Sequence, residues 1–220
     1  MEWMTRPPEL ITALTNLLNT LVALCFLLPR LRGLRTRPQG QRLWWWMVCA
    51  LAGSSLVGTV VHLVRWSYGA RMALWALLGP MMCLSSGLML LCAAAEEGEE
   101  RLRRARRPVR RGTLALCACA VGAALLGKPL APTIIAAAVS LIYAGWVFFR
   151  RARSDRACRL FAAGVAVNVP GGLCAMLRTL RFRLIWEMDY NSLFHLAMLA
   201  GLLLFWRGCV LRERAVPAEE

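Results

Sequence analysis

The chain has 220 residues, of which 59% are hydrophobic and only 18% are charged, and its mean hydropathy is +0.53. A soluble domain has about 45–50% apolar and about 25% charged residues, so this composition excludes disorder and argues against an ordinary soluble globule. The net charge is +15, but the basic residues stand in short clusters between long apolar runs. That pattern is typical of membrane flanks. We expect an all-α polytopic membrane protein whose partners are membrane lipids, not nucleic acid.

Segments long and apolar enough to cross a membrane occur seven times in what we expect to be one domain, residues 1–220. Crossing the hydrocarbon takes about 20 residues, with about 17–25 the usual range. The fourth segment is short and would need tilt, local thinning of the bilayer or snorkelling arginines. The predicted spans are residues 10–28, 43–64, 72–94, 113–127, 131–149, 158–177 and 191–207.

The basic residues alternate between rich and poor segments along the chain. Of the 27, 20 lie in the first, third and fifth loops and the C-terminal tail. Because basic loops stay in the cytoplasm, this predicts an N-terminus outside and a cytoplasmic C-terminus, which requires an odd number of spans. Lys128 is the only lysine, and this arginine bias suggests a high-GC genome and the inner membrane of a bacterium. The expected outside segments are 1–9 and 128–130, and the expected cytoplasmic segments are 29–42, 95–112, 150–157 and 208–220.

Two cytoplasmic segments carry further expectations. Trp44, Trp45 and Trp46 follow Arg42 directly and predict an interfacial anchor, with an aromatic ligand cage as the alternative. The stretch Glu96–Arg111 predicts an extension of the third helix that carries acid–base pairs at i,i+4 spacing. The alternative is a solvated loop that binds anionic lipid headgroups. None of the nine cysteines forms a CxxC pair, so we expect them to act as small apolar residues.

Both histidines of the chain fall inside predicted spans, where ionisable groups are costly and mark candidate sites. His62 ends the second span and His195 begins the seventh. Since these two spans run in opposite directions, both histidines should lie in the outer leaflet and approach each other across the bundle. His62 shares its helix face with Ser55, Gly58 and Thr59.

The first and sixth spans add polar groups at the same depth. The first carries a stripe of Glu9, Thr12, Asn16 and Asn19, in which Glu9 is the carboxylate expected nearest the histidines, with Asp189 second. In the sixth span, Pro170 should bend the helix, and Asn168 should face the bundle and bond a freed carbonyl group or a buried polar neighbour. The alternative role for such residues is hydrogen bonding between helices. The predicted ligand-binding residues of an outer-leaflet cavity are His62, His195, Thr59, Asn16, Asn19 and Asn168.

The segments around the histidines resemble motifs of the CREST superfamily, which includes alkaline ceramidases and progestin/adiponectin receptors. The segment GSSLVGTVVH (53–62) is similar to the second helix of that family, and NSLFHLAMLAGLLLF (191–205) is similar to the seventh. The resemblance implies a seven-helix bundle with the N-terminus outside. It also implies that histidines of these two helices hold a zinc ion, which activates water for hydrolysis of lipid amides.

The zinc site that the resemblance implies is incomplete in this sequence. A catalytic zinc needs three protein ligands and an open position for water. The chain offers His62 and His195, with Glu9 as the carboxylate. Other residues stand at the remaining family positions: Gly58 for a serine, Leu77 and Leu78 for carboxylates, and Leu199 for the second histidine of the seventh helix.

The function expected from these observations is therefore binding and not catalysis. We expect a membrane protein whose outer-leaflet polar cavity binds a lipid or a small amphiphile. The alternative is a metal-dependent hydrolase of lipid amides or esters, in which zinc would bind to His62, His195 and Glu9.

Overall fold

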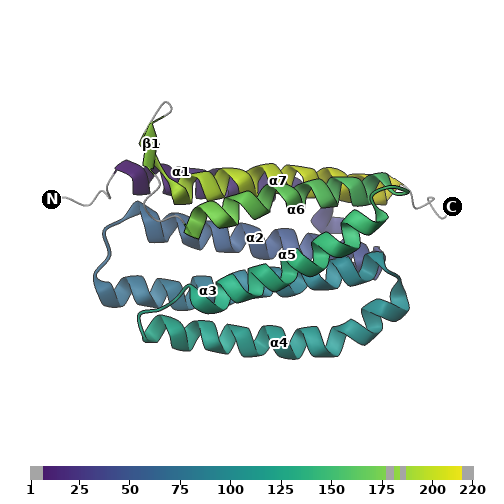
Figure 1. Ribbon diagram of the computed structural model, residues 1–220, viewed down its shortest axis with the longest axis horizontal. Helices are drawn as coiled ribbons and strands as arrows, with labels where there is room; N and C mark the ends of the chain where they lie inside the picture. Colours follow the sequence, from purple (N-terminus) through teal and green to yellow (C-terminus); the bar gives the residue numbers. More distant parts are fainter. Residues whose placement is uncertain (1–6, 177–180, 184–186, 215–220) are drawn as a thin grey trace.

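The computed structural model describes residues 7–176, 181–183 and 187–214, which form seven long helices, a short 3-10 segment and a small β-hairpin (Figure 1). This confirms the all-α class. The hairpin, in which Arg181 is paired with Asp189, was not predicted. The elements are α1 (Pro7–Leu27), η1 (Leu28–Thr36), α2 (Gln39–Leu63), α3 (Tyr68–Glu96), α4 (Glu99–Leu125), α5 (Ala131–Arg151), α6 (Arg156–Met176), β1 (Arg181–Arg183), β2 (Glu187–Asp189) and α7 (Tyr190–Arg214).

The long helices run side by side, so that α1 begins at one end of the bundle and α7 ends at the other (Figure 1). Within the described residues, six of them are long and apolar enough to cross a membrane, namely α1 to α5 and α7. The chain is thus an integral membrane protein. The predicted sixth span coincides with α6 except for residue 177, which lies outside the described residues, as do the chain ends 1–6 and 215–220.

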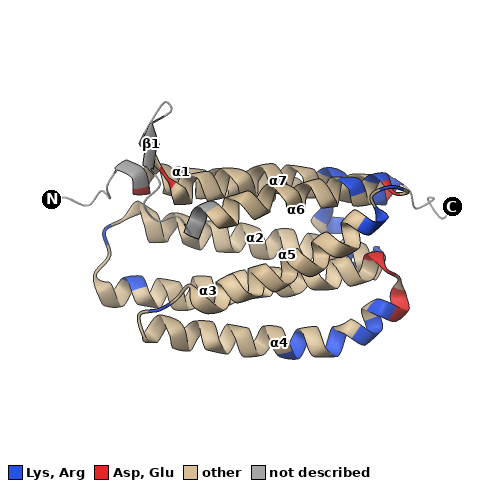
Figure 2. Ribbon diagram, viewed as in Figure 1, with Lys and Arg blue, Asp and Glu red and all other residues tan. Residues whose placement is uncertain are grey.

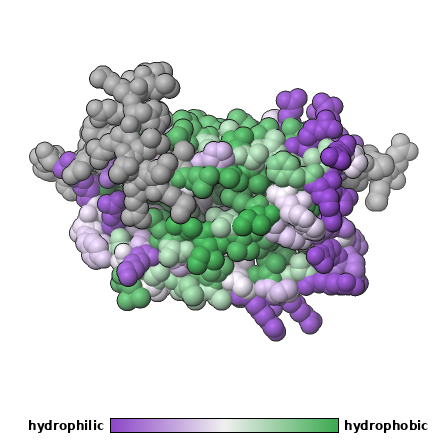
Figure 3. All heavy atoms as spheres, viewed as in Figure 1, coloured by the Kyte–Doolittle hydropathy of each residue, from purple (hydrophilic) through white to green (hydrophobic). Residues whose placement is uncertain are grey.

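Apolar side chains cover the outside of the bundle. Figure 3 shows hydrophobic residues across the middle of one face, and Figure 2 shows that most Lys and Arg residues gather at the end where α7 finishes. We call this end the arginine-rich end. Large side chains that elsewhere would be buried are exposed along the helices, among them Leu114, Leu125 and Ile142. An apolar exterior with one basic end suits a protein embedded in hydrocarbon.

The start of α4 corrects the sequence-based assignment of the third loop. α4 begins at Glu99, well before the predicted residue 113, and by length and composition it is able to cross a membrane. The added residues 99–112 include seven arginines, so the prediction that arginines snorkel at this end of the span stays open. Gly98 separates it from α3 with a φ of +118°, a conformation that favours glycine. The predicted acid–base pairs are present, as between Arg104 and Glu100. They belong to the first turns of α4, however, and not to an extension of α3.

The largest core cluster lies toward the arginine-rich end. Trp44 stacks on Phe161 of α6 with ring centroids 4.2 Å apart, and it also contacts rings of α5 and α7. Trp45 is fully buried, whereas Trp46 is 52% exposed. The anchor prediction is therefore wrong for Trp44 and Trp45. Successive residues on a helix point about 100° apart, so three neighbouring tryptophans cannot all face the lipid.

Helices α6 and α7 form the most extensive contact in the bundle. Each helix supplies a glycine against which a phenylalanine of the other packs: Gly164 faces Phe205, and Gly208 faces Phe161. A Cβ atom at either glycine would overlap the facing ring. Small residues of this kind let membrane helices approach closely. This reciprocal arrangement fixes how the two helices align along their length.

Candidate functional site

Polar residues predicted on the first and seventh spans meet inside the bundle. Thr12, Asn16 and Asn19 are buried on one face of α1. The Nδ2 atom of Asn16 lies 2.9 Å from Nε2 of His195, and Nδ2 of Asn19 donates to the backbone carbonyl of His195 at 3.0 Å. The stripe of α1 therefore lies against the start of α7.

Asp189, at the end of β2, joins this group of residues. Its Oδ1 atom accepts hydrogen bonds from Oγ1 of Thr12 at 3.1 Å, from Oγ of Ser192 at 3.0 Å and from the backbone N–H of Ser192 at 2.9 Å. The last bond caps the N-terminus of α7. The sequence analysis ranks Asp189 behind Glu9 as the carboxylate nearest the histidines, because it does not predict the hairpin that positions Asp189.

His62 lies at the same end of the bundle, on a buried face of α2. His62 lies within electrostatic range of His195, of the carboxylates Glu9 and Asp189 and of Arg71. Thr59 is also buried, but its hydroxyl donates to the carbonyl of Ser55 in its own helix. We call the set Thr12, Asn16, Asn19, His62, Asp189, Ser192 and His195 the histidine cluster.

The hydrogen bonds of Asn16 determine which nitrogen of His195 carries the proton. Nδ2 of Asn16 also donates to the carbonyl of Thr12 at 3.1 Å, so Nε2 of His195 accepts the other hydrogen of this amide. The proton of the neutral ring is then on Nδ1. Several buried atoms of this region have no hydrogen-bond partner in the described residues: Asn19 Oδ1, Ser55 Oγ, His62 Nδ1 and His195 Nδ1. The predicted binding role of the cluster remains a prediction.

The histidine cluster does not fit the zinc ion that the resemblance implies. Zinc binds an unprotonated imidazole nitrogen, and Asn16 already occupies that nitrogen on His195. Among the residues that the structure describes, His62, His195 and Glu9 are also not found as a group of three ligand atoms within 4.8 Å of one another.

Such a group does occur at the arginine-rich end, where it consists of Glu96, Asp155 and Cys158. The guanidinium of Arg212 already occupies it. Arg212 pairs with both carboxylates and approaches Sγ of Cys158 to 3.4 Å. One guanidinium thus pairs with both carboxylates and stands where a metal ion would have to bind.

Arg212 ties α7 to α3 and to the turn between α5 and α6. Burial alone would raise the pKa of Asp155, but hydrogen bonds from Arg212 and from the backbone N–H of Cys158 outweigh burial and leave this pKa below its usual value. Arg212 carries a guanidinium, which stays protonated in proteins, and it pairs with Glu96 and Asp155. Both groups are therefore charged in the folded protein at neutral pH.

Asn168 does not join the histidine cluster by any hydrogen bond within the described parts of the chain. It lies against Gly201 of α7, and its Nδ2 donates to the carbonyl of Gly164 at 2.8 Å. Pro170 frees a different carbonyl, that of Ala166. Of the two predicted kinds of partner, the freed carbonyl is therefore not used, and the side chain bonds instead to a carbonyl of the buried residue Gly164.

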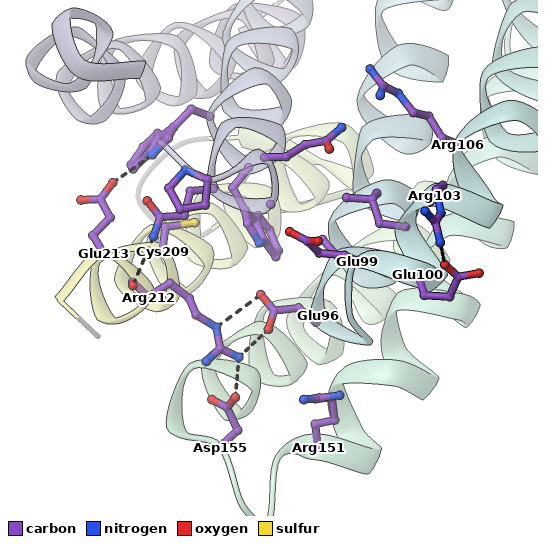
Figure 4. A pocket seen from close by; sticks show the side chains of 18 residues that line it. Glu96, Glu99, Glu100, Arg103, Arg106, Arg151, Asp155, Cys209, Arg212 and Glu213 are labelled. Atoms are coloured by element: carbon purple, nitrogen blue, oxygen red, sulfur yellow. Dashed lines mark hydrogen bonds and ion pairs between the residues drawn. The ribbon is translucent and has the colours of Figure 1, made fainter. Parts of the chain in front are cut away.

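A pocket of about 860 Å³ lies at the arginine-rich end, far from the histidine cluster (Figure 4). It is bounded by the start of α2, the ends of α3, α5 and α7, and the start of α4. Trp44 and Trp45 form part of its wall, and the indole N–H of Trp44 has no acceptor in the described residues. The charged residues that line it are Glu96, Glu99, Glu100, Arg103, Arg106, Arg151, Asp155, Arg212 and Glu213.

An apolar groove of about 250 Å³ adjoins this pocket between α3 and α4. Gln39, Leu102 and Arg106 line both spaces, so the groove continues from the pocket. Its walls include the exposed side chains of Leu84 and Leu114, which means that the groove opens at the side of the bundle. We call the pocket and the groove together the crevice.

Sequence reasoning did not locate the crevice. Its lining comes from five helices that are separated along the chain, so no single segment carries the pattern. One signal was present: Arg103, Arg106 and Arg110 recur at three- and four-residue spacing and therefore share one helix face. The alternative expectation that this stretch binds lipid headgroups came closest to the crevice.

No match is found among curated proteins or among solved structures. The resemblance to the CREST superfamily therefore remains a prediction. A family model described as "Family of unknown function (DUF6962)" matches residues 11–214, which cover nearly the whole chain. The chain belongs to the DUF6962 family.

Proposed function

We propose that this protein binds a membrane amphiphile in the crevice, with the polar headgroup in the pocket and an apolar chain in the groove. The observation that carries the proposal is the continuity of the two spaces through Gln39, Leu102 and Arg106. Ligand sites are concave, mostly apolar and supplied with a few polar groups. The charged pocket suits the polar headgroup of a lipid, and the leucine-lined groove that continues from it toward the side of the bundle suits the apolar chain.

The proposal includes a direction in the membrane. Basic segments remain on the cytoplasmic side, so the arginine-rich end would face the cytoplasm and the N-terminus would lie outside. Basic pockets between helices on that side are typical sites for lipid headgroups. The bound lipid would then belong to the cytoplasmic leaflet. In a bacterium this would be the cytoplasmic leaflet of the inner membrane. This is the opposite leaflet from the cavity expected from the sequence alone.

Hydrolysis of a lipid amide or ester, the alternative expected from the sequence, draws no support from the histidine cluster. Its metal would need Nε2 of His195, which is engaged with Asn16. The crevice, by contrast, offers a binding site that requires no rearrangement of buried hydrogen bonds.

Native mass spectrometry of the purified protein in mild detergent tests the proposal. The variant Leu114→Trp places a large ring in the groove, and we expect it to lose a retained phospholipid that the wild-type protein carries. Leu125→Trp is the matched control, because Leu125 is 73% exposed on the same helix and does not line the groove. Equal retention of lipid by the two variants would reject binding in the crevice.

A further inference from the structure

Most charged side chains on the pocket wall already have partners within the protein (Figure 4). Arg212 is shared by two carboxylates and Glu213 by two arginines, so these groups are engaged with one another and not with a ligand. Ion pairs also hold the wall in a defined shape. The pairs are Arg212 with Glu96 and Asp155, Arg103 with Glu100, and Glu213 with Arg30 and Arg37.

Three charged residues on the wall have no such partner among the described residues: Glu99, Arg106 and Arg151. Figure 4 draws no interaction to any of them, and in that view Arg106 and Arg151 lie on opposite sides of Glu99. Two guanidinium groups and one carboxylate therefore remain for a ligand. A purely anionic ligand would bring its charge toward Glu99, and a neutral ligand would leave all three groups unpaired.

From these three unpaired groups we infer that the headgroup bound in the pocket carries both a phosphate and an ammonium group, as in a phosphatidylethanolamine. The inference rests on the proposed function and names the ligand class for that site. Guanidinium groups pair with phosphate through two parallel hydrogen bonds, which suits Arg106 at the junction of pocket and groove. The carboxylate of Glu99 pairs with the ammonium group.

The order of these groups along α4 agrees with the order of groups in such a lipid. Arg106 lines both the groove and the pocket, so a phosphate bound to it lies where the chain meets the headgroup. Glu99 lines only the pocket and stands seven residues earlier, about 10 Å along the helix axis. The apolar chain of the lipid would therefore lie in the groove, its phosphate at Arg106 and its ammonium group at Glu99.

A competition between two lipids tests the inference. The purified protein is mixed with equal amounts of dioleoyl phosphatidylethanolamine and dioleoyl phosphatidylglycerol, which differ in the ammonium group, and bound lipid is measured by native mass spectrometry. We expect the wild-type protein to prefer the ethanolamine lipid about tenfold and Glu99→Gln to lose this preference. Arg106→Gln should weaken binding of both lipids. Arg107→Gln is the matched control, because Arg107 is the exposed neighbour that does not line the crevice.

The outcomes separate this inference from the proposed function. If Leu114→Trp loses lipid but the wild-type protein binds both lipids equally, the headgroup assignment is overturned and the crevice stands. If Leu114→Trp retains lipid, the proposed function fails and the inference fails with it. Soluble glycerophosphoethanolamine forms a third arm. If it binds as tightly as the lipid, and equally to Leu114→Trp, the ligand is a soluble phosphoammonium compound and a lipid source is excluded.

Discussion

Asn16 and His195 lie 179 positions apart in the chain, yet their side chains share a hydrogen bond of 2.9 Å. Asn16 is also pressed against α2, where a Cβ atom at Gly58 would come within 3.0 Å of its Oδ1. One amide therefore contacts three helices and sets the tautomer of a histidine. Asn16 is therefore a residue at which α1, α2 and α7 meet.

Removing this amide should weaken the bundle in a way that depends on His195. Hydrogen bonds between membrane helices contribute about 0.6 kcal/mol on average and at most about 1.7 kcal/mol. We expect a double-mutant cycle of Asn16→Ala and His195→Ala to give a coupling energy in this range when stability in detergent is measured. Thr15→Val is the control, because Thr15 bonds only to a carbonyl of its own helix. Additive effects of the two substitutions would contradict the direct bond.

A methyl group at Gly201 should be tolerated only if Asn168 is made smaller. Its Cβ would overlap Nδ2 of Asn168, whose position is held by the bond to Gly164. Overpacking costs about 1–3 kcal/mol, so Gly201→Ala should lower the melting temperature, and adding Asn168→Ala should restore part of the loss. If Gly201→Ala is equally harmless in both backgrounds, the contact is not as close as described.

Acid should remove the stabilisation that Asp155 provides. Its folded-state pKa lies below the usual value of 3.8, so the ionised carboxylate stabilises the fold. This contribution is complete above the unfolded pKa and is lost as the pH falls through the lower folded pKa. The difference in melting temperature between the wild-type protein and Asp155→Asn should therefore be constant near neutral pH and shrink below about pH 4.

A surface pair provides the comparison for this titration. Glu100 pairs with Arg103 and Arg104, but its side chain is 50% exposed. Exposed pairs contribute little to stability, so Glu100→Gln should differ little from the wild-type protein at any pH. An Asp155→Asn difference that persists unchanged in acid would show that the carboxylate charge is not what matters.

The single lysine makes the orientation in the membrane measurable. Lys128 lies in the turn between α4 and α5, at the end opposite the arginine-rich end (Figure 2). If that end is outside, an amine reagent that cannot cross membranes should label Lys128 on intact cells, and peptide mass spectrometry should locate the label. The variant Lys128→Arg should lose this label. Labelling that appears only after the cells are opened would reverse the orientation.

Much of the bundle could be predicted because helical periodicity and apolar length are local properties. The stripe of Thr12, Asn16 and Asn19 could be recognised as inward-facing, since polar side chains in hydrocarbon need partners. The depth of the two histidines followed from the directions of their helices. These conclusions required no knowledge of which helices are neighbours.

The errors have a common physical origin in contacts that no local pattern records. Trp44 and Trp45 resemble an interfacial anchor in sequence, but Trp44 packs against Phe161 and other rings of distant helices, and Trp45 contacts Glu213 and Arg30. The pocket is formed by helix ends brought together only by packing. Similarly, Asp189 reaches Thr12 because a hairpin precedes α7. Only the break between α3 and α4 had a local signal, because Gly98 interrupts a run of good helix-forming residues.

The mutual fit of glycine and phenylalanine between α6 and α7 restricts how the bundle can move. Sliding one helix past the other would drive Phe205 and Phe161 out of their glycine notches at the same time, so the two helices are braced against any piston-like motion. They should enter the membrane as a pair and then tilt or turn only as a pair. Helix α4 packs against α3 through the same kind of contact, because Gly87 of α3 lies against Thr113 of α4 and Gly79 lies against Ala120. Widening of the crevice between α3 and α4 would therefore have to separate these two contacts.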